Sequence, residues 1–551
     1  MNRYLYVFAC AAILAAILVP VSCATKTPKA YLEHGDAYIA EGKPRKAIRA
    51  YSRAIELQPA RAAAHLRRGF AHAACQRFAE AIDDYTRAIE LQPDNPTAYF
   101  NRGLAYHRLG QHDNAIADYS KTIELEHTNA AAFNNRGIVH NDAAQYIDAV
   151  RDFTRAIELR PEYAAAYFNR GIATARLGQH DLAVRDYTRA IQLDPSNPGI
   201  WYNRGVAHAQ SGNLAQAIAD YTHAIELDST DPLPFYARGL AHMHSGNPHQ
   251  AIEDFRHAIA LNPNLAEFYY HRALAFLTID DPRAALRDLS IAITIKPDSP
   301  DALLRRASTY AALSEHQKAL QDATRAAELN PQSALAHLQR ALALQALRKH
   351  NAALDAISRS IELDPSQPRA HHTRGLLHSA IGQSDAAVAD FDNAIALNRT
   401  EPRYYFDRGV ALDDAGQTDR AIEDFSRAIL LQPNYAEAHY NRGLAHYRKG
   451  LIAEAIRDYS HVIELHPADP KPYYNRALAH YAAGNLDQAI ADYTTAIQLD
   501  PTDPDPYNNR AVALFDKNEY DKAADDVRIC LKLGGIVHQD FLKALQTITG
   551  L

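Results

Sequence analysis

The chain has 551 residues, of which 47% are apolar and 22% are charged, a balance typical of soluble folded proteins. This length exceeds what one compact core usually organises, so several domains or a repeat array are expected. The formal net charge of −7 gives no support to a nucleic-acid partner, which would need a basic surface. Alanine-rich helical segments recur, and no run alternates apolar with polar residues, so the sequence predicts an all-α protein.

Residues 1–27 form a separate N-terminal segment. Arg3 is followed by an apolar run from Tyr4 to Val19 and then by small residues, as in secretory signals. Left uncleaved, these 16 apolar residues would span about 24 Å as a helix, which is short of the roughly 30 Å hydrocarbon core of a bilayer. An uncleaved membrane anchor is one of three alternatives for this segment.

The other two alternatives differ in the point of cleavage. Val21 and Ser22 precede Cys23 and resemble the end of a bacterial lipobox, which makes Cys23 a candidate lipidation site. Pro20 departs from that motif, which prefers leucine there. Cleavage after Ala24 would instead release a soluble protein. All three alternatives export the chain if its source is bacterial, either anchored on the extracytoplasmic side of the membrane or periplasmic or secreted.

A strict 34-residue period begins at Pro28. We number fifteen successive units from this residue, and the positions inside each unit from 1 to 34. Position 8 is glycine or alanine in every unit, from Gly35 to Ala511. Position 20 is alanine in every unit, from Ala47 to Ala523, and no insertion or deletion interrupts the series. Such regularity predicts a stack of identical structural units.

Each unit is predicted to contain two helices. Proline or alanine opens the first helix, and the small residue at position 8 permits close approach of the second. Glycine at position 15, present in nine units, suits the left-handed turn that ends a helix. The second helix should bury positions 20, 24 and 27, which in unit 5 are Ala183, Tyr187 and Ala190.

Over 28–535, this pattern of bulky residue, glycine, aromatic, alanine and proline resembles the tetratricopeptide repeat (TPR) family. The resemblance implies an all-α fold, a right-handed superhelix (α-solenoid) of antiparallel helix pairs whose first helices line a concave groove. Residues 536–551 carry apolar side chains at helical spacing and are predicted to form the C-terminal capping helix that such arrays require.

The sequence shows no motif of a catalytic or cofactor site. Ten of the 23 glycines stand at position 8 and nine at position 15, which leaves no phosphate-binding loop, and neither GxSxG nor HExxH occurs. His242, His244 and His249 are close in sequence, but His242 holds a packing position and no ligand spacing recurs. We therefore expect no enzyme activity, no cofactor, no metal and no small-molecule substrate.

Arginine at position 7 and aspartate at position 23 are predicted to form an ion pair. The arginine is present in fourteen units and replaced only by His34, whereas the aspartate is present in thirteen and replaced by Ala50 and Ala356. Unit 1 lacks both partners, which favours a partly buried pair that joins the two helices of a unit. A solvated pair is the alternative. In both cases the arginine is structural.

Asparagine at position 6 is expected to face the groove. An amide both donates and accepts, so it can bond the main chain of an extended peptide of any sequence, as similar asparagine ladders in TPR arrays do. The alternative is a repeat consensus inherited by duplication, without a ligand. The candidate peptide-binding residues are the position-6 amides and the aromatic residues beside them at position 5: Asn101, Asn135, Asn169, Asn203, Asn441, Asn475 and Asn509, with Phe100, Phe168, Tyr202, Tyr440 and Tyr474.

The sequence therefore predicts a non-enzymatic scaffold that binds proteins or peptides and helps to assemble an extracytoplasmic (envelope) complex. Its membrane contact would come through the N-terminal segment or a lipid on Cys23. The alternative is a targeting or regulatory subunit of a separate enzyme such as a glycosyltransferase. The chaperone-tail clamp of some TPR proteins is not expected, because position 9 carries aliphatic residues such as Leu104 and Ile138. Units 7 to 12 lack the position-6 asparagine, and their role stays open.

Overall fold

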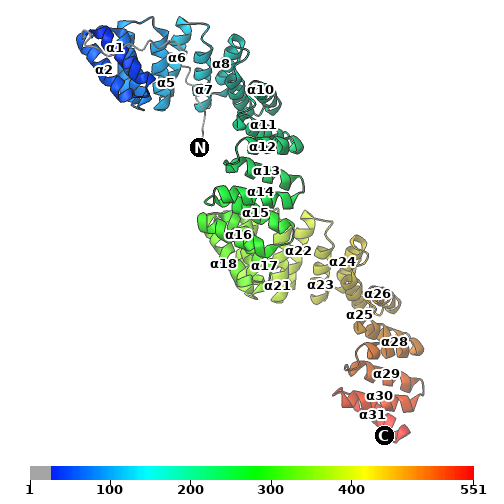
Figure 1. Ribbon diagram of the computed structural model, residues 1–551. Helices are drawn as coiled ribbons and strands as arrows, with labels where there is room; N and C mark the ends of the chain where they lie inside the picture. The colour runs from blue at the N-terminus through cyan, green and yellow to red at the C-terminus, as the bar shows by residue number, and fades with distance from the viewer. Residues whose placement is uncertain (1–26, 551) are drawn as a thin grey trace. The chain divides into compact units, whose positions relative to one another are not determined.

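The computed structural model describes residues 27–550, and every regular element in this part of the chain is an α-helix. The helices follow one another in pairs, one pair to each 34-residue unit, and Figure 1 shows successive pairs lying side by side. The all-α solenoid expected from the sequence is confirmed. The first helices of units 1 to 15 are α1 (Pro28–Ala40), α3 (Ala62–Ala74), α5 (Pro96–Arg108), α7 (Ala130–Asp142), α9 (Ala164–Arg176), α11 (Pro198–Gln210), α13 (Pro232–His244), α15 (Ala266–Thr278), α17 (Pro300–Ala312), α19 (Ala334–Ala346), α21 (Pro368–Ala380), α23 (Pro402–Asp414), α25 (Ala436–Arg448), α27 (Pro470–Ala482) and α29 (Asp505–Asp516).

The second helix of each unit packs against the first across a short turn. The second helices are α2 (Pro44–Leu57), α4 (Phe78–Leu91), α6 (His112–Leu125), α8 (Tyr146–Leu159), α10 (His180–Leu193), α12 (Leu214–Leu227), α14 (Pro248–Leu261), α16 (Pro282–Ile295), α18 (His316–Leu329), α20 (His350–Leu363), α22 (Ser384–Leu397), α24 (Thr418–Leu431), α26 (Ile452–Leu465), α28 (Leu486–Leu499) and α30 (Tyr520–Lys532). One further helix, α31 (Gln539–Thr549), follows the last pair.

The turn inside each unit depends on a left-handed residue at position 15. In nine units this residue is glycine, with φ between 68° and 79°, as the sequence predicted. In the other six units a residue with a side chain adopts the same conformation, with φ between 56° and 63°. This left-handed conformation is disfavoured for residues with a Cβ atom. These six residues are Gln76, Ala144, Asp280, Ser314, Arg348 and Asn518.

The small residue at position 8 allows the aromatic ring at position 24 to lie against the first helix. A Cβ atom added at Gly171 would come within 2.6 Å of Cε1 of Tyr187, so the ring occupies the space that a side chain would need. In units 8, 9 and 10 position 8 is alanine, and position 24 is Leu289, Ala323 and Ile357 in turn. A smaller or narrower side chain at position 24 therefore accompanies the added methyl group in these three units.

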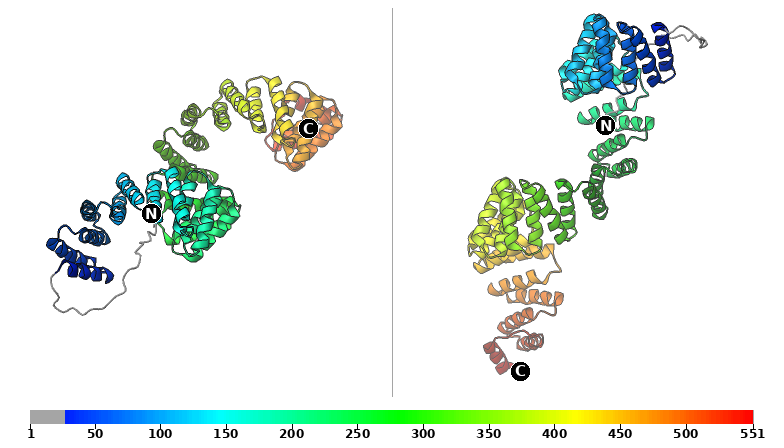
Figure 2. Two further views of the ribbon diagram at one scale, coloured as in Figure 1. Left: turned by 90° about the horizontal axis from the view of Figure 1, so that it is seen from above. Right: turned by 90° about the vertical axis from the view of Figure 1, so that its left-hand side faces the viewer.

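First helices of neighbouring units contact one another. The helix α5 touches α3 and α7, and α21 touches α19 and α23, whereas no neighbouring pair of second helices in the described residues makes comparable contact. Neighbouring units pack mainly through the second helix of one unit and the first helix of the next. First helices also approach one another more closely than second helices do, which places the first helices on the inner face of the stack. The chain divides into two compact parts, one ending at Asn264 and one beginning at Leu265. Figure 2 shows the stacked pairs within each part from two further directions.

The last helix closes the second part. Leu545 of α31 is fully buried, and the ring of Phe541 contacts that of Phe515 in α29 with 5.4 Å between centroids. Both residues join the apolar cluster of the last unit, which includes Leu514 and Val527. The apolar face of α30 is thereby covered, and the capping helix predicted from the sequence is confirmed.

The N-terminal segment and its candidate lipidation site, Cys23, lie outside the described residues. Between residues 27 and 550, no helix combines the length and the apolar character that a bilayer-spanning helix needs. The expectations for export and anchoring therefore stay predictions from the sequence.

Candidate functional site

Thirteen of the fourteen position-7 arginines form ion pairs inside their units. In unit 5, Nε and Nη2 of Arg170 donate to the two carboxylate oxygens of Asp186 over 2.8 and 2.7 Å. Thirteen units of the described chain hold the same pair, with the arginine side chains 17–25% exposed and the aspartates only 5–10% exposed. The partly buried pair predicted from the sequence is confirmed, and the solvated alternative is wrong.

The same arginines also join neighbouring units, which the sequence reasoning missed. Nη1 of Arg170 donates to the hydroxyl oxygen of Thr154 in unit 4 over 3.1 Å. Position 25 supplies this hydroxyl, sixteen residues before the arginine, and its recurrence as serine or threonine was the signal available in the sequence. The other serine and threonine acceptors are Ser52, Thr86, Ser120, Thr188, Thr222, Ser290, Ser426, Ser460 and Thr494.

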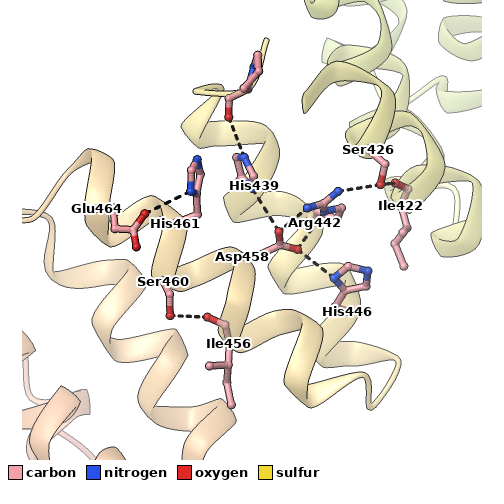
Figure 3. Close-up of polar contacts among 11 residues, drawn as sticks. Ile422, Ser426, His439, Arg442, His446, Ile456, Asp458, Ser460, His461 and Glu464 are labelled. Carbon is pink, nitrogen blue, oxygen red and sulfur yellow. Dashed lines mark hydrogen bonds and ion pairs between the residues drawn. The ribbon is translucent and has the colours of Figure 1, made fainter. Parts of the chain in front are cut away.

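In unit 13, the side chains of one arginine and two histidines surround the carboxylate of Asp458 (Figure 3). Asp458 accepts hydrogen bonds from Arg442 over 2.6 and 3.0 Å, and its oxygens also lie 3.3 Å from Nδ1 of His439 and 3.0 Å from Nδ1 of His446. Burial raises the pKa of Asp458, but the hydrogen bonds from the two histidines and the arginine outweigh it and hold the pKa well below its usual range. The carboxylate therefore holds helices together and does not reach toward a ligand.

Histidines at position 11 lie beside the same aspartates. Nε2 of His242 lies 3.9 Å from Oδ2 of Asp254, with 17% of the histidine side chain exposed, as expected for a packing residue. Burial lowers the pKa of His242, because desolvation disfavours the charged ring. Nδ1 of His244 is 2.8 Å from the carbonyl oxygen of Leu240. No group of three or more histidine, cysteine or acidic side chains in the described residues is arranged to hold a metal ion.

The position-6 asparagines form the candidate binding row, and their amides have a fixed orientation. Nδ2 donates to the main-chain carbonyl oxygen four residues earlier in Asn101 (2.9 Å), Asn203 (2.7 Å) and Asn441 (2.8 Å). A carbonyl oxygen can only accept a hydrogen bond, so the group facing it must be the amide N–H. The opposite side of each amide is therefore its oxygen. These three half-buried side chains present a hydrogen-bond acceptor at the surface of the first helix.

Other asparagines of the row bond across the boundary between units. Nδ2 of Asn169 donates to Oδ1 of Asn134 in the preceding unit over 3.1 Å. In units 14 and 15, Nδ2 of Asn475 and Asn509 donates to the hydroxyl oxygens of Tyr440 and Tyr474 over 2.7 and 2.8 Å. These last two amides thus link first helices of neighbouring units and serve the packing of the stack as well as any ligand.

The aromatic residues at position 5 are more involved in packing than the sequence suggested. The ring of Phe100 lies 5.6 Å from that of Tyr119, and Tyr202 lies 5.9 Å from Tyr221, measured between centroids. Each pair joins position 5 of the first helix to position 24 of the second. Phe168, Tyr440 and Tyr474 make the same contact with Tyr187, Tyr459 and Tyr493. All five position-5 rings are half-buried, so each offers only part of its surface to a ligand.

The row changes character between its two runs of asparagine. In unit 11, Thr373 donates its hydroxyl to the carbonyl oxygen of Arg369 over 2.8 Å, as the asparagines do with their N–H. In unit 12, Asp407 lies 2.6 Å from Nε2 of His372. The middle of the row therefore lacks asparagine, and its residues differ from one unit to the next, from Ala237 in unit 7 to Gln339 in unit 10.

Comparison with known families gives one consistent result. The family described as TPR repeat matches residues 35–74, 71–110, 174–212, 414–450 and 479–518. The description tetratricopeptide repeat matches residues 96–129, 198–231, 232–265, 273–334, 304–368, 372–429 and 436–469. Together these stretches cover well over half of the chain. No curated protein matches the sequence.

Several solved structures are similar in fold. The Cut9–Hcn1 hetero-tetramer of the APC/C is 15% identical, over 82% of this chain and 98% of that chain, with a TM-score of 0.38. A tetratricopeptide repeat protein from Parabacteroides merdae is 20% identical, over 46% and 100% of the two chains, with a TM-score of 0.37. A complex of Naa15 and Naa10 bound to HypK is 15% identical, over 95% and 96%, with a TM-score of 0.33. At these identities the likeness concerns the helix-pair fold alone.

Proposed function

The chain belongs to the tetratricopeptide repeat family, and from this premise we propose that it is a non-enzymatic scaffold that binds an extended segment of a protein partner. The binding surface is the inner face of units 3 to 6, where Asn101, Asn135, Asn169 and Asn203 follow one another at the same position of neighbouring first helices. The observation that carries the proposal is the fixed orientation of the Asn101 and Asn203 amides, whose oxygens remain on the side away from the helix.

The side-chain oxygens of Asn101 and Asn203 can accept a hydrogen bond from the main chain of a partner of any sequence, whereas Oδ1 of Asn135 already accepts one from Nδ2 of Asn134 over 3.3 Å. Every residue of a partner except proline carries a main-chain N–H, and an amide oxygen accepts it whatever the side chain is. Aliphatic residues at position 9, such as Leu104 and Ile172, lie half-buried on the same helices and add apolar contact. The affinity of the row for a main chain thus comes from several weak contacts of the same kind.

The proposal is tested by replacing the four amides together. Each hydrogen bond contributes about 0.5–1.5 kcal/mol, so the variant with Asn101, Asn135, Asn169 and Asn203 all changed to alanine should bind its partner far more weakly. Additivity is incomplete between neighbouring sites, so the loss is expected to be smaller than four times one bond. Partner capture by the full-length protein is the measurement, with helical melting recorded on the same samples.

The control is Arg170→Ala, which removes the buried ion pair next to Asn169. This change leaves Asp186 buried without its arginine and should lower stability while leaving intrinsic binding intact. Full binding by the fourfold variant, together with lost binding by a still stable Arg170→Ala, would reverse the roles assigned to these residues. Mass spectrometry of co-purified proteins then identifies the partner, and an enzyme found in every preparation would favour a targeting subunit instead.

We further propose that the protein acts outside the cytoplasm, in the assembly of an envelope complex, and is anchored by a lipid on Cys23. The support is the sequence alone, in which Val21 and Ser22 precede Cys23 after an apolar run. The Cys23→Ser variant should move from the membrane to the soluble fraction and lose labelling by a palmitate analogue. Wild-type protein that takes up no label would contradict the lipid anchor.

A further inference from the structure

One position-7 arginine has lost its internal partner. Unit 10 spans residues 334–367, and its arginine, Arg340, faces Ala356 where thirteen other units hold aspartate. Within the described part of the chain, no hydrogen bond or ion pair of Arg340 is found, although its side chain is half-buried. Its neighbours in the series both keep the pair with aspartate. Arg306 donates to Asp322 over 2.7 and 2.8 Å, and Arg374 pairs with Asp390 at 2.6 Å.

Arg340 also lacks the bond to the preceding unit. In unit 9, Nη1 of Arg306 reaches the hydroxyl oxygen of Ser290 over 3.1 Å. Thr324 offers the equivalent hydroxyl to Arg340, but no bond joins them in the described structure. Its guanidinium thus keeps its N–H donors without a protein acceptor. A half-buried guanidinium in this state gains charge-assisted hydrogen bonds when an anion reaches it.

The surroundings of Ala356 are apolar. Ala356 is 4% exposed and belongs to a cluster of buried residues that includes Leu338, Leu344 and Ile357. Leu344 stands at position 11, where seven units hold histidine beside the aspartate. Charge-assisted hydrogen bonds are stronger where water is partly excluded, so a carboxylate that reached Arg340 here would be bound more tightly than at an open surface.

We propose that Arg340 is a binding site for a carboxylate that comes from outside the repeat, either an aspartate or glutamate side chain of a partner protein or a small free carboxylate. The planar guanidinium matches the two oxygens of a carboxylate, and the sister units show this bidentate geometry thirteen times in the same fold. The site is distinct from the asparagine row of units 3 to 6. The proposal for Arg340 does not depend on peptide binding by that row.

The test compares acetate with chloride at equal ionic strength and pH 7, using the full-length protein. Hydrogen exchange of amides in α19 and α20 reports on unit 10 alone, because units of such arrays open locally. In the wild type, acetate at about one to nine times its dissociation constant should slow this exchange by about two- to tenfold. Exchange in α9 and α10, whose arginine is already paired, should not respond.

Two variants decide the origin of the effect. Ala356→Asp supplies the missing internal carboxylate and should show slow exchange in chloride with no further response to acetate. Arg340→Met removes the guanidinium and should also show no response, and it carries the test if the buried aspartate of the first variant prevents folding. An acetate effect of equal size in the wild type and in Arg340→Met would overturn the proposal, as would no effect in the wild type.

A third arm separates the two sources of carboxylate. The probe is the tripeptide acetyl-Ala-Asp-Ala-amide, with acetyl-Ala-Asn-Ala-amide as its matched control. A response to the aspartate peptide at lower concentration than to acetate supports a partner's side chain, whereas a response to acetate alone supports a small free anion. Equal responses to the aspartate and asparagine peptides would show that the carboxylate is not what Arg340 recognises.

Discussion

At the scale of single residues, the left-handed position 15 shows how one backbone conformation is imposed by its surroundings. Gly178 adopts it with φ of 75° and Ala144 with φ of 58°, so the turn keeps its shape without glycine. The packing of the two helices determines the shape of the turn. The residue at position 15 therefore adopts the left-handed conformation even where this conformation is energetically unfavourable for it. Left-handed conformations cost residues with a Cβ atom roughly 1–2 kcal/mol.

Ala144→Gly should therefore stabilise unit 4. The gain is expected to be up to about 1 kcal/mol, since the relieved strain is partly offset by the greater freedom of glycine in the unfolded chain. Ala143→Gly is the matched control, because Ala143 has φ of −82° and gains nothing from glycine. Hydrogen exchange in α7 and α8 measures both. Slower exchange in the control than in Ala144→Gly would show that backbone strain is not the cause.

At the scale of the helix pair, close approach depends on small residues in both helices. Position 20 is alanine with no exposed surface in unit 3, where it is Ala115. On the other helix, a Cβ atom added at Gly103 would lie 3.3 Å from Tyr119 and from Asp118, so both sides of the crossing are already full. The crossing of α5 and α6 therefore has no room for a larger side chain unless the two helices move apart.

Ala115→Leu should destabilise unit 3 by about 1–3 kcal/mol through overpacking. Ala117→Leu, two residues along the same helix at an exposed position, is the matched control and should change stability little. Because each unit contacts only its neighbours, the loss should appear as faster exchange in α5 and α6 and should fade with distance. Equal effects of the two substitutions would mean that the helices are not in the close contact described.

At the scale of the whole molecule, the stack repeats one acid-sensitive arrangement many times. His72, His208, His242 and His480 all stand at position 11, and burial lowers the pKa of each, with a neighbouring aspartate opposing the shift. Their Nδ1 atoms are buried without a hydrogen-bond partner in the described structure, so a proton there would have no acceptor. The neutral ring is the form that fits the folded stack.

The protein should therefore lose stability as the pH falls below about 6.5, the usual pKa of histidine in an unfolded chain. The sign follows from the lowered pKa: below that pH the unfolded chain binds more protons than the folded one, and the loss is complete below the folded pKa. A variant with all four histidines changed to tyrosine, the residue at position 11 of units 3 and 9, should lose less stability between pH 7 and pH 5. Thermal midpoints at both pH values measure this, and parallel pH profiles would contradict it.

The repeat sequence by itself determined the all-α fold and the positions of its helix pairs. Strict phase from Gly35 to Ala511 predicted the helix pairs and the glycine turns, because each unit buries its apolar face against itself and its neighbours. The apolar spacing of residues 536–551 predicted the capping helix. The pairing of Arg170 with Asp186 could also be predicted, since unit 1 lacks both residues. Such contacts are local, so a periodic pattern carries enough information to define them.

Only the tertiary structure decided how the polar side chains are used. The sequence gives asparagine the same position in seven units, yet Asn101 bonds its own helix whereas Asn475 bonds Tyr440 of the unit before. It also identifies Ala356 as an exception without showing that Arg340 is then left without an acceptor. Hydrogen bonds depend on the direction of each donor and acceptor, and those directions are set by how neighbouring helices approach, which a residue pattern does not record.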